Sequence, residues 1–302
     1  MAEFLERLSQ VAVLVFVVTC TAAAGLGLAA REFAAPLRRT RLVLLALAAN
    51  FVVAPAIAFG LTEVFALDRP YEIGLLLLAG AAGAPFLPKL AEAAKGDLAF
   101  SVGLMLLLMA ASVAFLPLAL PVLIPGLAAE PWPLLRPLLL TMLLPLAAGM
   151  AVRHASGRWA ARLRPGFAAT SNVSMVVVVA LLIGLNFRAM LGTFGSGAVA
   201  VAVVFVALSL AVGYALGGPD AGTRSVLGLG TGQRNVAAAL LLATQNYPDE
   251  PGVVVMLIVS TLAGLVVLLP AARWCARRSS RGTDHETPVA ARVGTVTEES
   301  KI

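Results

Sequence analysis

The stretch "GAPFLPKLAEAAKGD", Gly83 to Asp97, follows a run of Leu, Ala and Gly and places two prolines just ahead of a lysine. Proline removes a backbone donor and clashes with the preceding turn, so Pro85 and Pro88 predict a broken helix. In lipid, the carbonyl groups that a break frees are tolerated only where protein or a water-filled cavity satisfies them. We therefore expect a break at a protein-lined cavity, with the ammonium of Lys89 pointing into it at the start of the second half-helix.

The composition around this stretch is that of a membrane protein. Hydrophobic residues make up 60% of the 302 residues, charged residues make up 13%, and the mean hydropathy is +0.94. A membrane-spanning helix needs roughly 17 to 25 mostly apolar residues, and runs of about that length follow one another along the chain. They predict an all-α, polytopic membrane protein with nine transmembrane helices. The expected spans are Leu8–Ala30, Leu42–Thr62, Ile73–Pro88, Leu98–Ala129, Pro137–Val152, Pro165–Phe187, Met190–Pro219, Ala221–Gln245 and Gly252–Ala272.

Lysine and arginine concentrate on alternate loops between these spans, which sets the expected orientation. One side receives most of them: residues 31–41, 153–164 and 273–281, Lys95 and Arg224. The other side receives four arginines: Arg7, Arg69, Arg136 and Arg188. We therefore expect a multi-pass protein of the inner (plasma) membrane, with its N-terminus outside and its C-terminus in the cytoplasm. The net charge of +6 then reflects anchoring at the inner leaflet, and no nucleic-acid partner is expected.

The end of the chain differs in composition from the rest. Residues 279–302 are polar and interrupted by Gly and Pro, which predicts a disordered cytoplasmic tail. Residues 1–278 are expected to form a single transmembrane transporter domain. The two cysteines and two histidines show no metal-ligand spacing, so the residue pattern indicates neither a metal site nor a cofactor.

The chain resembles itself in two halves that share the same order of features. The segment "GLAAR" at Gly27–Arg31 ends the first span, and "GLNFR" at Gly184–Arg188 ends the sixth. The apolar runs that close the two halves are also similar, and an interrupted, charge-bearing helix comes before each. Internal duplication of this kind is common in transporters. We expect inverted repeats at about 8–126 and 165–274, linked by a fifth helix at about 133–152 that reverses the second unit.

A second interrupted helix, "GLGTGQRNVAAALLLA" at Gly228–Ala243, is the counterpart of the first. We expect Gly230 and Gly232 to loosen the backbone just before three polar residues: Gln233, Arg234 and Asn235. Corresponding interruptions in the two halves of a transporter mark its substrate site near the bilayer midplane, where helices 3 and 8 would cross. The expected substrate-binding residues are therefore Lys89, Gln233, Arg234 and Asn235.

The charged candidates have competing interpretations. Arg234 lies too deep in its span to reach an interface easily, and an intramembrane charge is functional by default, so a role in the transport cavity is favoured. Lys89 could instead reach the cytoplasmic interface, or pair with Glu92 one turn later. Glu92 lies closer to that interface, where an ion pair with Lys89 or Lys95 is the simpler interpretation.

The amide side chains within the spans also allow two roles. Gln233 and Asn235 either line the cavity or bridge neighbouring helices. Asn50 and Asn172 are weaker candidates for the cavity, because a single amide often only connects helices in lipid.

Two segments carry a resemblance to a known family. "AKGDLAFSV", which follows the first break, is similar to the A-[KR]-G-[ND]-x-x-[LF]-S run of the bile acid:sodium symporter family. "GQRNVAAALLLA" resembles that family's G-x-Q-N-x-x-L-A segment with a local rearrangement, and the likeness covers essentially Val11 to Trp274. The resemblance implies a core domain with two crossed, broken helices, a smaller panel domain, and alternating access between them. Nine-helix members lack the first helix of the ten-helix version.

The chain departs from the family pattern where the family binds sodium. The family's Gly-Gly and Ser-Asn pairs at the first break are here Gly83-Ala84 and Leu87-Pro88, followed by Lys89. Its hydroxyl-bearing stretch is here Met105 to Met109, and the glutamate before the second break is absent. Sodium needs several hard oxygen ligands, so the motif residues do not support a sodium site.

These departures leave three forms of coupling open. Lys89 could replace one sodium ion and leave transport uncoupled, or transport could be driven by protons through Lys89 and Glu92. The alternative is that sodium still binds main-chain carbonyls at the second break, which leave no signature in the sequence.

The function favoured by these features is secondary active transport of a small organic anion. A bile-acid-like steroid, a keto acid or another small carboxylate would suit the cations Lys89 and Arg234. A membrane sensor or scaffold on the same fold is an alternative. An intramembrane enzyme is disfavoured, because the spans lack paired Asp residues, an H-E-x-x-H motif and a Ser/His pair.

The charge pattern predicts that a phosphatase active only in the periplasm is inactive when fused to the C-terminus in a bacterial host. The matched control is a fusion after Asp68, in a loop expected outside, which should be active. An active C-terminal fusion would contradict the expected orientation.

Overall fold

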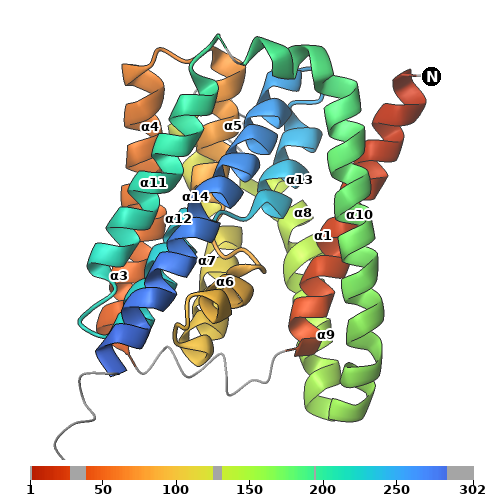
Figure 1. Cartoon of the computed structure of the whole chain (residues 1–302). Coiled ribbons are helices and arrows are strands. Elements are labelled where there is room, and N and C mark those ends of the chain that lie inside the picture. Colours follow the sequence, from red (N-terminus) through yellow and green to blue (C-terminus); the bar gives the residue numbers. More distant parts are fainter. Residues whose placement is uncertain (1, 28–38, 125–130, 194, 284–302) are drawn as a thin grey trace, which may run out of the picture.

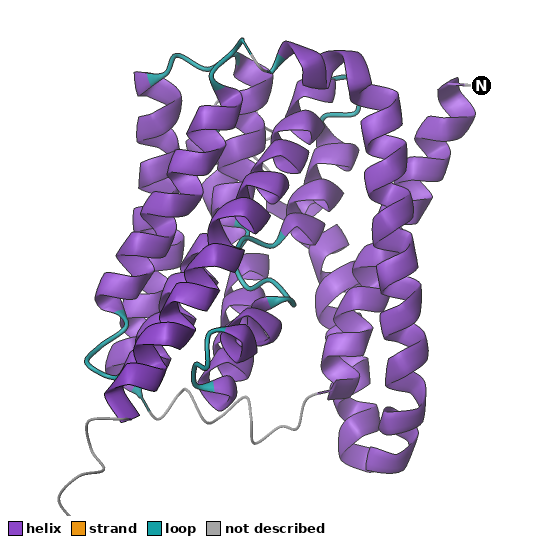
Figure 2. Ribbon diagram, in the orientation of Figure 1, coloured by secondary structure: helices purple, strands orange, loops and turns teal. Residues whose placement is uncertain are grey.

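The computed structural model describes residues 2–27, 39–124, 131–193 and 195–283, and these residues contain helices and no strand (Figure 1, Figure 2). Seven helical segments within these ranges are long and apolar enough to cross a membrane. They are Arg7–Gly27, Thr40–Val64, Leu98–Leu123, Leu134–Ala155, Gly157–Leu185, Ala198–Leu216 and Pro251–Arg278. The prediction of an all-helical, multi-pass membrane protein is thus confirmed.

The helical elements follow the predicted spans closely. In chain order they are α1 (Ala2–Gly27), α3 (Thr40–Ala48), η1 (Ala49–Val53), α4 (Ala54–Val64), α5 (Arg69–Gly80), α6 (Leu87–Ala93), α7 (Leu98–Leu123), α8 (Pro131–Leu138), η2 (Leu139–Leu143), α9 (Leu144–Ala155), α10 (Gly157–Gly192), α11 (Ala198–Leu216), α12 (Ala221–Gly232), α13 (Val236–Asn246) and α14 (Pro251–Thr283). The elements η1 and η2 are π-helical turns inside longer helices.

Two of the predicted spans are interrupted. Residues 81–86 separate α5 from α6, and residues 233–235 separate α12 from α13. Pro85 lies in the first break, as the sequence predicts. Pro88 lies in the first turn of α6, where its missing N–H costs no helical hydrogen bond.

The glycines before the second break have a different role from the predicted one. α12 remains helical through Gly232, and neither Gly230 nor Gly232 has a positive φ. A Cβ at Gly230 would lie 3.1 Å from Cδ2 of Leu87, and one at Gly232 would lie 2.8 Å from Cδ2 of Leu268. The glycines therefore allow α6 and α14 to pack closely on α12. The break begins at the residue after Gly232, as the sequence predicts, but the glycines themselves are helical.

The helices pack in two groups. α1, α9 and α10 pack on one another, and the broken helices pack with α4, α7, α11 and α14 (Figure 1). A Cβ at Gly149 of α9 would lie 2.7 Å from the carbonyl oxygen of Ala22 in α1, so a small residue is needed at this contact. Such small residues let helix backbones approach one another in membranes. Contacts of α10 with α14 and of α1 with α13 join the two groups.

Each π-helical turn is followed by a proline two residues later. Pro55 follows η1, and Pro145 follows η2. Widening the helix accommodates a ring that would clash with the preceding turn. In η1 the N–H of Ala54 donates to the carbonyl of Ala49, five residues back. The next donor in that pattern would be Pro55, which has no N–H, so the Asn50 carbonyl is left without a helical partner.

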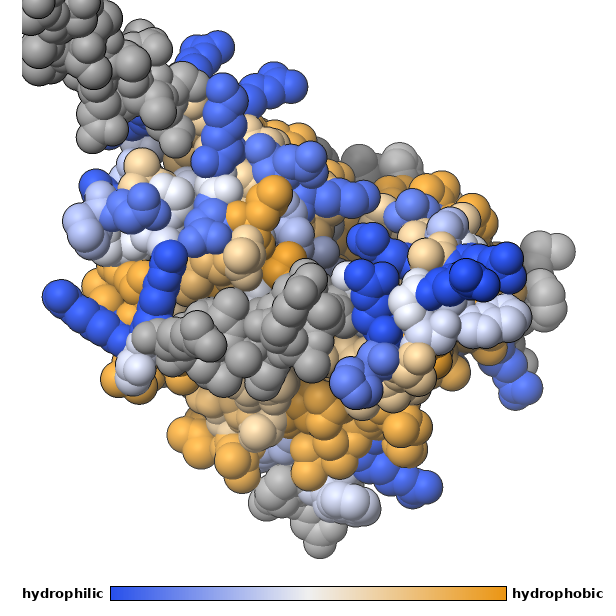
Figure 3. Space-filling view, turned by 90° about the horizontal axis from the view of Figure 1, so that it is seen from below, coloured by the Kyte–Doolittle hydropathy of each residue, from blue (hydrophilic) through white to orange (hydrophobic). Residues whose placement is uncertain are grey.

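The lower end of the bundle in Figure 1 carries the start of α3, the α6–α7 and α9–α10 turns and the end of α14, and the sequence of these segments is rich in Lys and Arg. Figure 3 looks onto this end and shows hydrophilic side chains over it and apolar ones around the sides. Arg41, Lys95, Arg158 and Arg277 are exposed. The start of α1 lies at the opposite end from the end of α14 (Figure 1).

Two helices extend beyond the predicted spans. α10 begins at Gly157 rather than near Pro165, which lies inside the helix. α14 continues to Thr283, so the start of the segment predicted as a disordered tail is helical. The rest of that segment, 284–302, lies outside the described residues.

We predict that Gly83→Ala destabilises the fold. Gly83 has a φ of +79°, and a Cβ there would meet the backbone of α7 at Met109 and, at 2.7 Å, the carbonyl carbon of Leu108. The loss in free energy of unfolding should be at least about 2 kcal/mol. Gly60→Ala is the matched control, because a Cβ at Gly60 meets nothing within 4 Å. Equal thermal unfolding temperatures for the two purified variants would contradict this account of the break.

Candidate functional site

Arg234 lies in the second break and is 4% exposed. Its Nε donates to the carbonyl oxygen of Leu78 at 3.4 Å. Nη1 donates to Oδ1 of Asn50 at 2.7 Å and to the carbonyl oxygen of Thr231 at 3.3 Å. Nη2 donates to the carbonyl oxygens of Asn50, at 3.1 Å, and of Ala79. A guanidinium has five N–H donors, and the five acceptors here match that number.

Two of these acceptors are carbonyl oxygens that the helix breaks leave without a helical partner. The last carbonyls of a helix have no donor four residues on, and Ala79 and Thr231 lie in the last turns of α5 and α12. The Leu78 carbonyl, also in the last turn of α5, accepts from the N–H of Ala81 at 3.1 Å as well as from Arg234. The N–H of Asn235, which would pair with Thr231 in a continuous helix, donates to Ala81 at 2.8 Å. Both helix ends also carry partial negative charge, which favours a cation between them. The guanidinium therefore completes two interrupted hydrogen-bond ladders.

Asn50 is the other main partner of the guanidinium. Its side chain is fully buried, and its Nδ2 donates to the Ala46 carbonyl at 2.9 Å and to Oγ1 of Thr231 at 3.2 Å. These two bonds turn Oδ1 towards Arg234. The backbone carbonyl of Asn50 is the one that η1 and Pro55 leave without a helical partner. Asn50 therefore presents two oxygens to the guanidinium, one from its side chain and one from its backbone. The sequence indicated Asn50 only as a weaker candidate, and the structure makes it a central contact of the site.

Asn235 connects the two breaks on the other side of the junction. Its Oδ1 accepts from the N–H of Ala238 at 3.2 Å and thereby caps α13. Its Nδ2 donates to the Gly83 carbonyl at 3.3 Å, and its N–H donates to the Ala81 carbonyl. Asn235 is 1% exposed. Of the two roles left open by the sequence, the contacts of Asn235 are those of a residue that bridges helices.

A serine that sequence reasoning missed completes the first break. The N–H of Ala82 donates to Oγ of Ser112 at 2.8 Å, and that hydroxyl donates to the Ala82 carbonyl at 3.0 Å. Ser112 lies one turn after the Met105–Met109 stretch of α7, where the family's hydroxyl-bearing residues are replaced. The available signal was a single hydroxyl within a long apolar run.

The positive charge of Arg234 is not neutralised by its contacts. All five acceptors are backbone or amide oxygens, and none is a carboxylate. The guanidinium carbon also lies 6.0 Å from the ring centroid of Phe205. A buried cation with only neutral partners raises the electrostatic potential around it, because the low dielectric screens it weakly.

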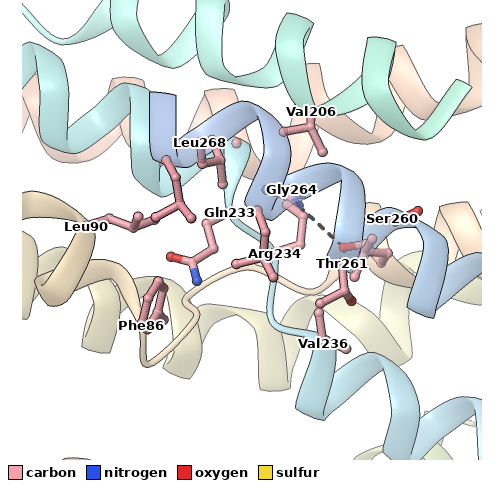
Figure 4. A pocket seen from close by; sticks show the side chains of 14 residues that line it. Phe86, Leu90, Val206, Gln233, Arg234, Val236, Ser260, Thr261, Gly264 and Leu268 are labelled. Carbon is pink, nitrogen blue, oxygen red and sulfur yellow. Dashed lines mark hydrogen bonds between the residues drawn. The ribbon is translucent and has the colours of Figure 1, made fainter. Parts of the chain in front are cut away.

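A small cavity of about 70 Å³ adjoins the second break (Figure 4). Its polar lining comes from Gln233 and Arg234 at the break and from Ser260 and Thr261 on α14. Its apolar lining includes Leu78, Phe86, Leu90, Val206, Val236, Leu265, Leu268 and Leu269. Oε1 of Gln233 and Oγ of Ser260 are buried and have no hydrogen-bond partner in the described part of the chain. The cavity is polar on one side and large enough to admit water.

The structure does not place Lys89 with Arg234. Lys89 is exposed, and its Nζ lies 5.9 Å from the ring centroid of Phe86 and within electrostatic range of Cys20 in α1. Phe86 and Leu90, one turn apart, present the α6 face that lines the cavity, and Lys89 lies outside that face. Glu92 is also exposed, and within the described ranges neither it nor Lys89 forms an ion pair.

Two broken helices whose breaks meet inside a bundle of apolar helices form the arrangement in which secondary transporters place their binding sites. The fold and the site together define a membrane transporter. A family comparison agrees: residues 12–193, more than half of the chain, match the Sodium Bile acid symporter family. The chain belongs to this family, as the resemblance implied. The matched range includes the first break and ends before α12. A comparison with curated protein sequences gave no match.

We predict that Ser112→Ala destabilises the protein by about 1–3 kcal/mol, because both polar groups of Ala82 lose a buried partner. Ser209→Ala is the matched control. Ser209 is also a fully buried helical serine, but its hydroxyl has no partner within the described residues, so its removal should be neutral or stabilising. Equal losses of thermal stability in the two purified variants would show that Ser112 does not support the break.

Proposed function

We propose that the chain is a secondary transporter of a small organic anion that works by alternating access. The observation that carries the proposal is the buried charge of Arg234, which has five neutral partners and lines a cavity beside the two helix breaks. An anion in that cavity would be attracted by a charge that no carboxylate contacts. The amide of Gln233 and the hydroxyl of Ser260 line the same cavity and have N–H and O–H donors for it.

Alternating access would open and close this cavity. A volume of about 70 Å³ is well below the roughly 300–1,000 Å³ of typical ligand pockets, so enclosure of a substrate needs a second conformation with more space. The two groups of helices supply the moving parts in this proposal, with α1, α9 and α10 against the group that contains the breaks. Phe86, Leu265 and Leu269, which line the cavity, are each more than a third exposed and would flank the entrance.

The proposal includes nine crossings in two inverted repeats. Each half contains one interrupted helix in the same place in its order, α5–α6 in the first and α12–α13 in the second. Addition of these two interrupted helices to the seven long spans gives nine crossings. The odd number agrees with chain ends at opposite ends of the bundle, and the basic end would face the cytoplasm of the inner membrane.

We predict saturable uptake of a carboxylate into proteoliposomes and no uptake of its uncharged amide analogue. The substrates to compare are a steroid carboxylate, a keto acid and a short-chain carboxylate. Gln233→Leu should raise KM roughly tenfold, because a hydrogen bond to a charged group is lost. Gln245→Leu is the matched control, since Gln245 is exposed near the end of α13 and should leave KM unchanged.

Two results would contradict this proposal. Equal uptake of the carboxylate and its amide would remove the role of the buried charge in selectivity. Carboxylates that raise the thermal unfolding temperature without being taken up would support the alternative, a sensor or scaffold on the transporter fold.

A further inference from the structure

We infer that the guanidinium of Arg234 is a tethered replacement for a coupling sodium ion, which links the two helix breaks permanently and makes transport independent of sodium. The inference rests on the proposed transport function for its meaning. Its evidence is separate, because it concerns the cation that holds the breaks together and not the substrate.

The oxygens around Arg234 are of the kind that a sodium ion would take. Sodium prefers several hard oxygen ligands, and backbone carbonyls at broken helices serve this purpose in transporters. Here four carbonyls and one amide oxygen converge from three separate segments: η1, the end of α5 and the end of α12. A cation is favoured there, because two helix ends with partial negative charge meet at a buried junction.

The guanidinium occupies these oxygens itself. A sodium ion about 4 Å from it would bind roughly a thousandfold more weakly, at an effective dielectric constant of about 20. The five acceptors are also already paired with N–H donors, so sodium would have to break bonds that the tether holds in place. The residues present therefore do not fit a sodium ion at this junction.

The sequence suggested this replacement for a different residue. Lys89 was expected to stand in for a sodium ion at the first break, but its side chain is exposed and does not line the cavity. In the segment where the family has G-x-Q-N, the chain reads Gly232-Gln233-Arg234-Asn235, which brings a cation to the position next to the shared asparagine. The structure assigns the replacement to Arg234.

The test compares thermal unfolding in sodium chloride and choline chloride at equal ionic strength, on the full chain in lipid nanodiscs. The wild-type unfolding temperature should be the same in both salts. Arg234→Gln should unfold roughly 5–10 °C lower in choline, because several buried carbonyls lose their donors. Sodium should then raise its unfolding temperature in a saturable manner, because the vacated oxygens become available to a free cation.

Two further variants make the result specific. Arg234→Lys keeps a tethered cation, so it should be insensitive to sodium and should decide the question if Arg234→Gln does not fold. Arg224→Gln is the matched control on α12, the half-helix that leads into the second break. Arg224 is only half-buried and stacks on Tyr214 at 4.6 Å from the ring centroid, so its loss should create no response to sodium.

A saturable, sodium-specific rise in the unfolding temperature of the wild type or of Arg234→Lys overturns the inference. So does a folded Arg234→Gln variant that sodium does not stabilise. These measurements need no substrate and are independent of the uptake assay. Carboxylate uptake with a steep sodium dependence would leave the proposed function intact and refute the replacement.

Discussion

The hydrogen bonds from one guanidinium to the carbonyls of two interrupted helices are the interaction on which the rest of the site depends. A helix that stops within a membrane exposes carbonyls that lipid cannot satisfy. Two such helices stop at the same place, and each end adds partial negative charge. Arg234 resolves both problems with one planar group, since its donors fan out to oxygens from three segments.

The surroundings of the guanidinium are arranged to let these segments meet. Gly83 brings the first break against the backbone of α7, and Ser112 on that helix supplies both partners of the next peptide group. Asn235 ties the second break to the first through its backbone and its side chain. Small residues and short polar side chains thus allow close main-chain contact at the junction, because they leave the room that long side chains would fill. The result is a rigid junction beside a small cavity.

The sequence predicted the features that depend on local chemistry. Apolar runs predicted the helices, and prolines predicted the first break. The second break was predicted from glycines just ahead of a cluster of polar residues, and it lies directly after Gly232. The sequence could not give the partners of Arg234, because Asn50 lies on a helix far away in the chain, and only the folded backbone shows which of its oxygens are free. The π-helical turns were also missed, since one extra residue per turn hardly changes a run of uniformly apolar side chains. The sequence left open whether Lys89 enters the cavity or reaches the interface, because its direction depends on the residue at which α6 begins, and the structure shows it exposed.

A charge that belongs to the protein does not depart with the cargo, and this changes where the membrane voltage acts. In the proposed transport cycle, the charge of a bound monovalent anion cancels that of Arg234, so the loaded site is electrically neutral. The empty site is positive. The voltage would therefore act on the return of the empty carrier, at up to about 2.3 kcal/mol for each elementary charge moved through 100 mV. A symporter that binds a cation from solution depends instead on the concentration of that ion on each side of the membrane. With Arg234 built into α12–α13, the cell's electrical potential would set the preferred direction of the cycle.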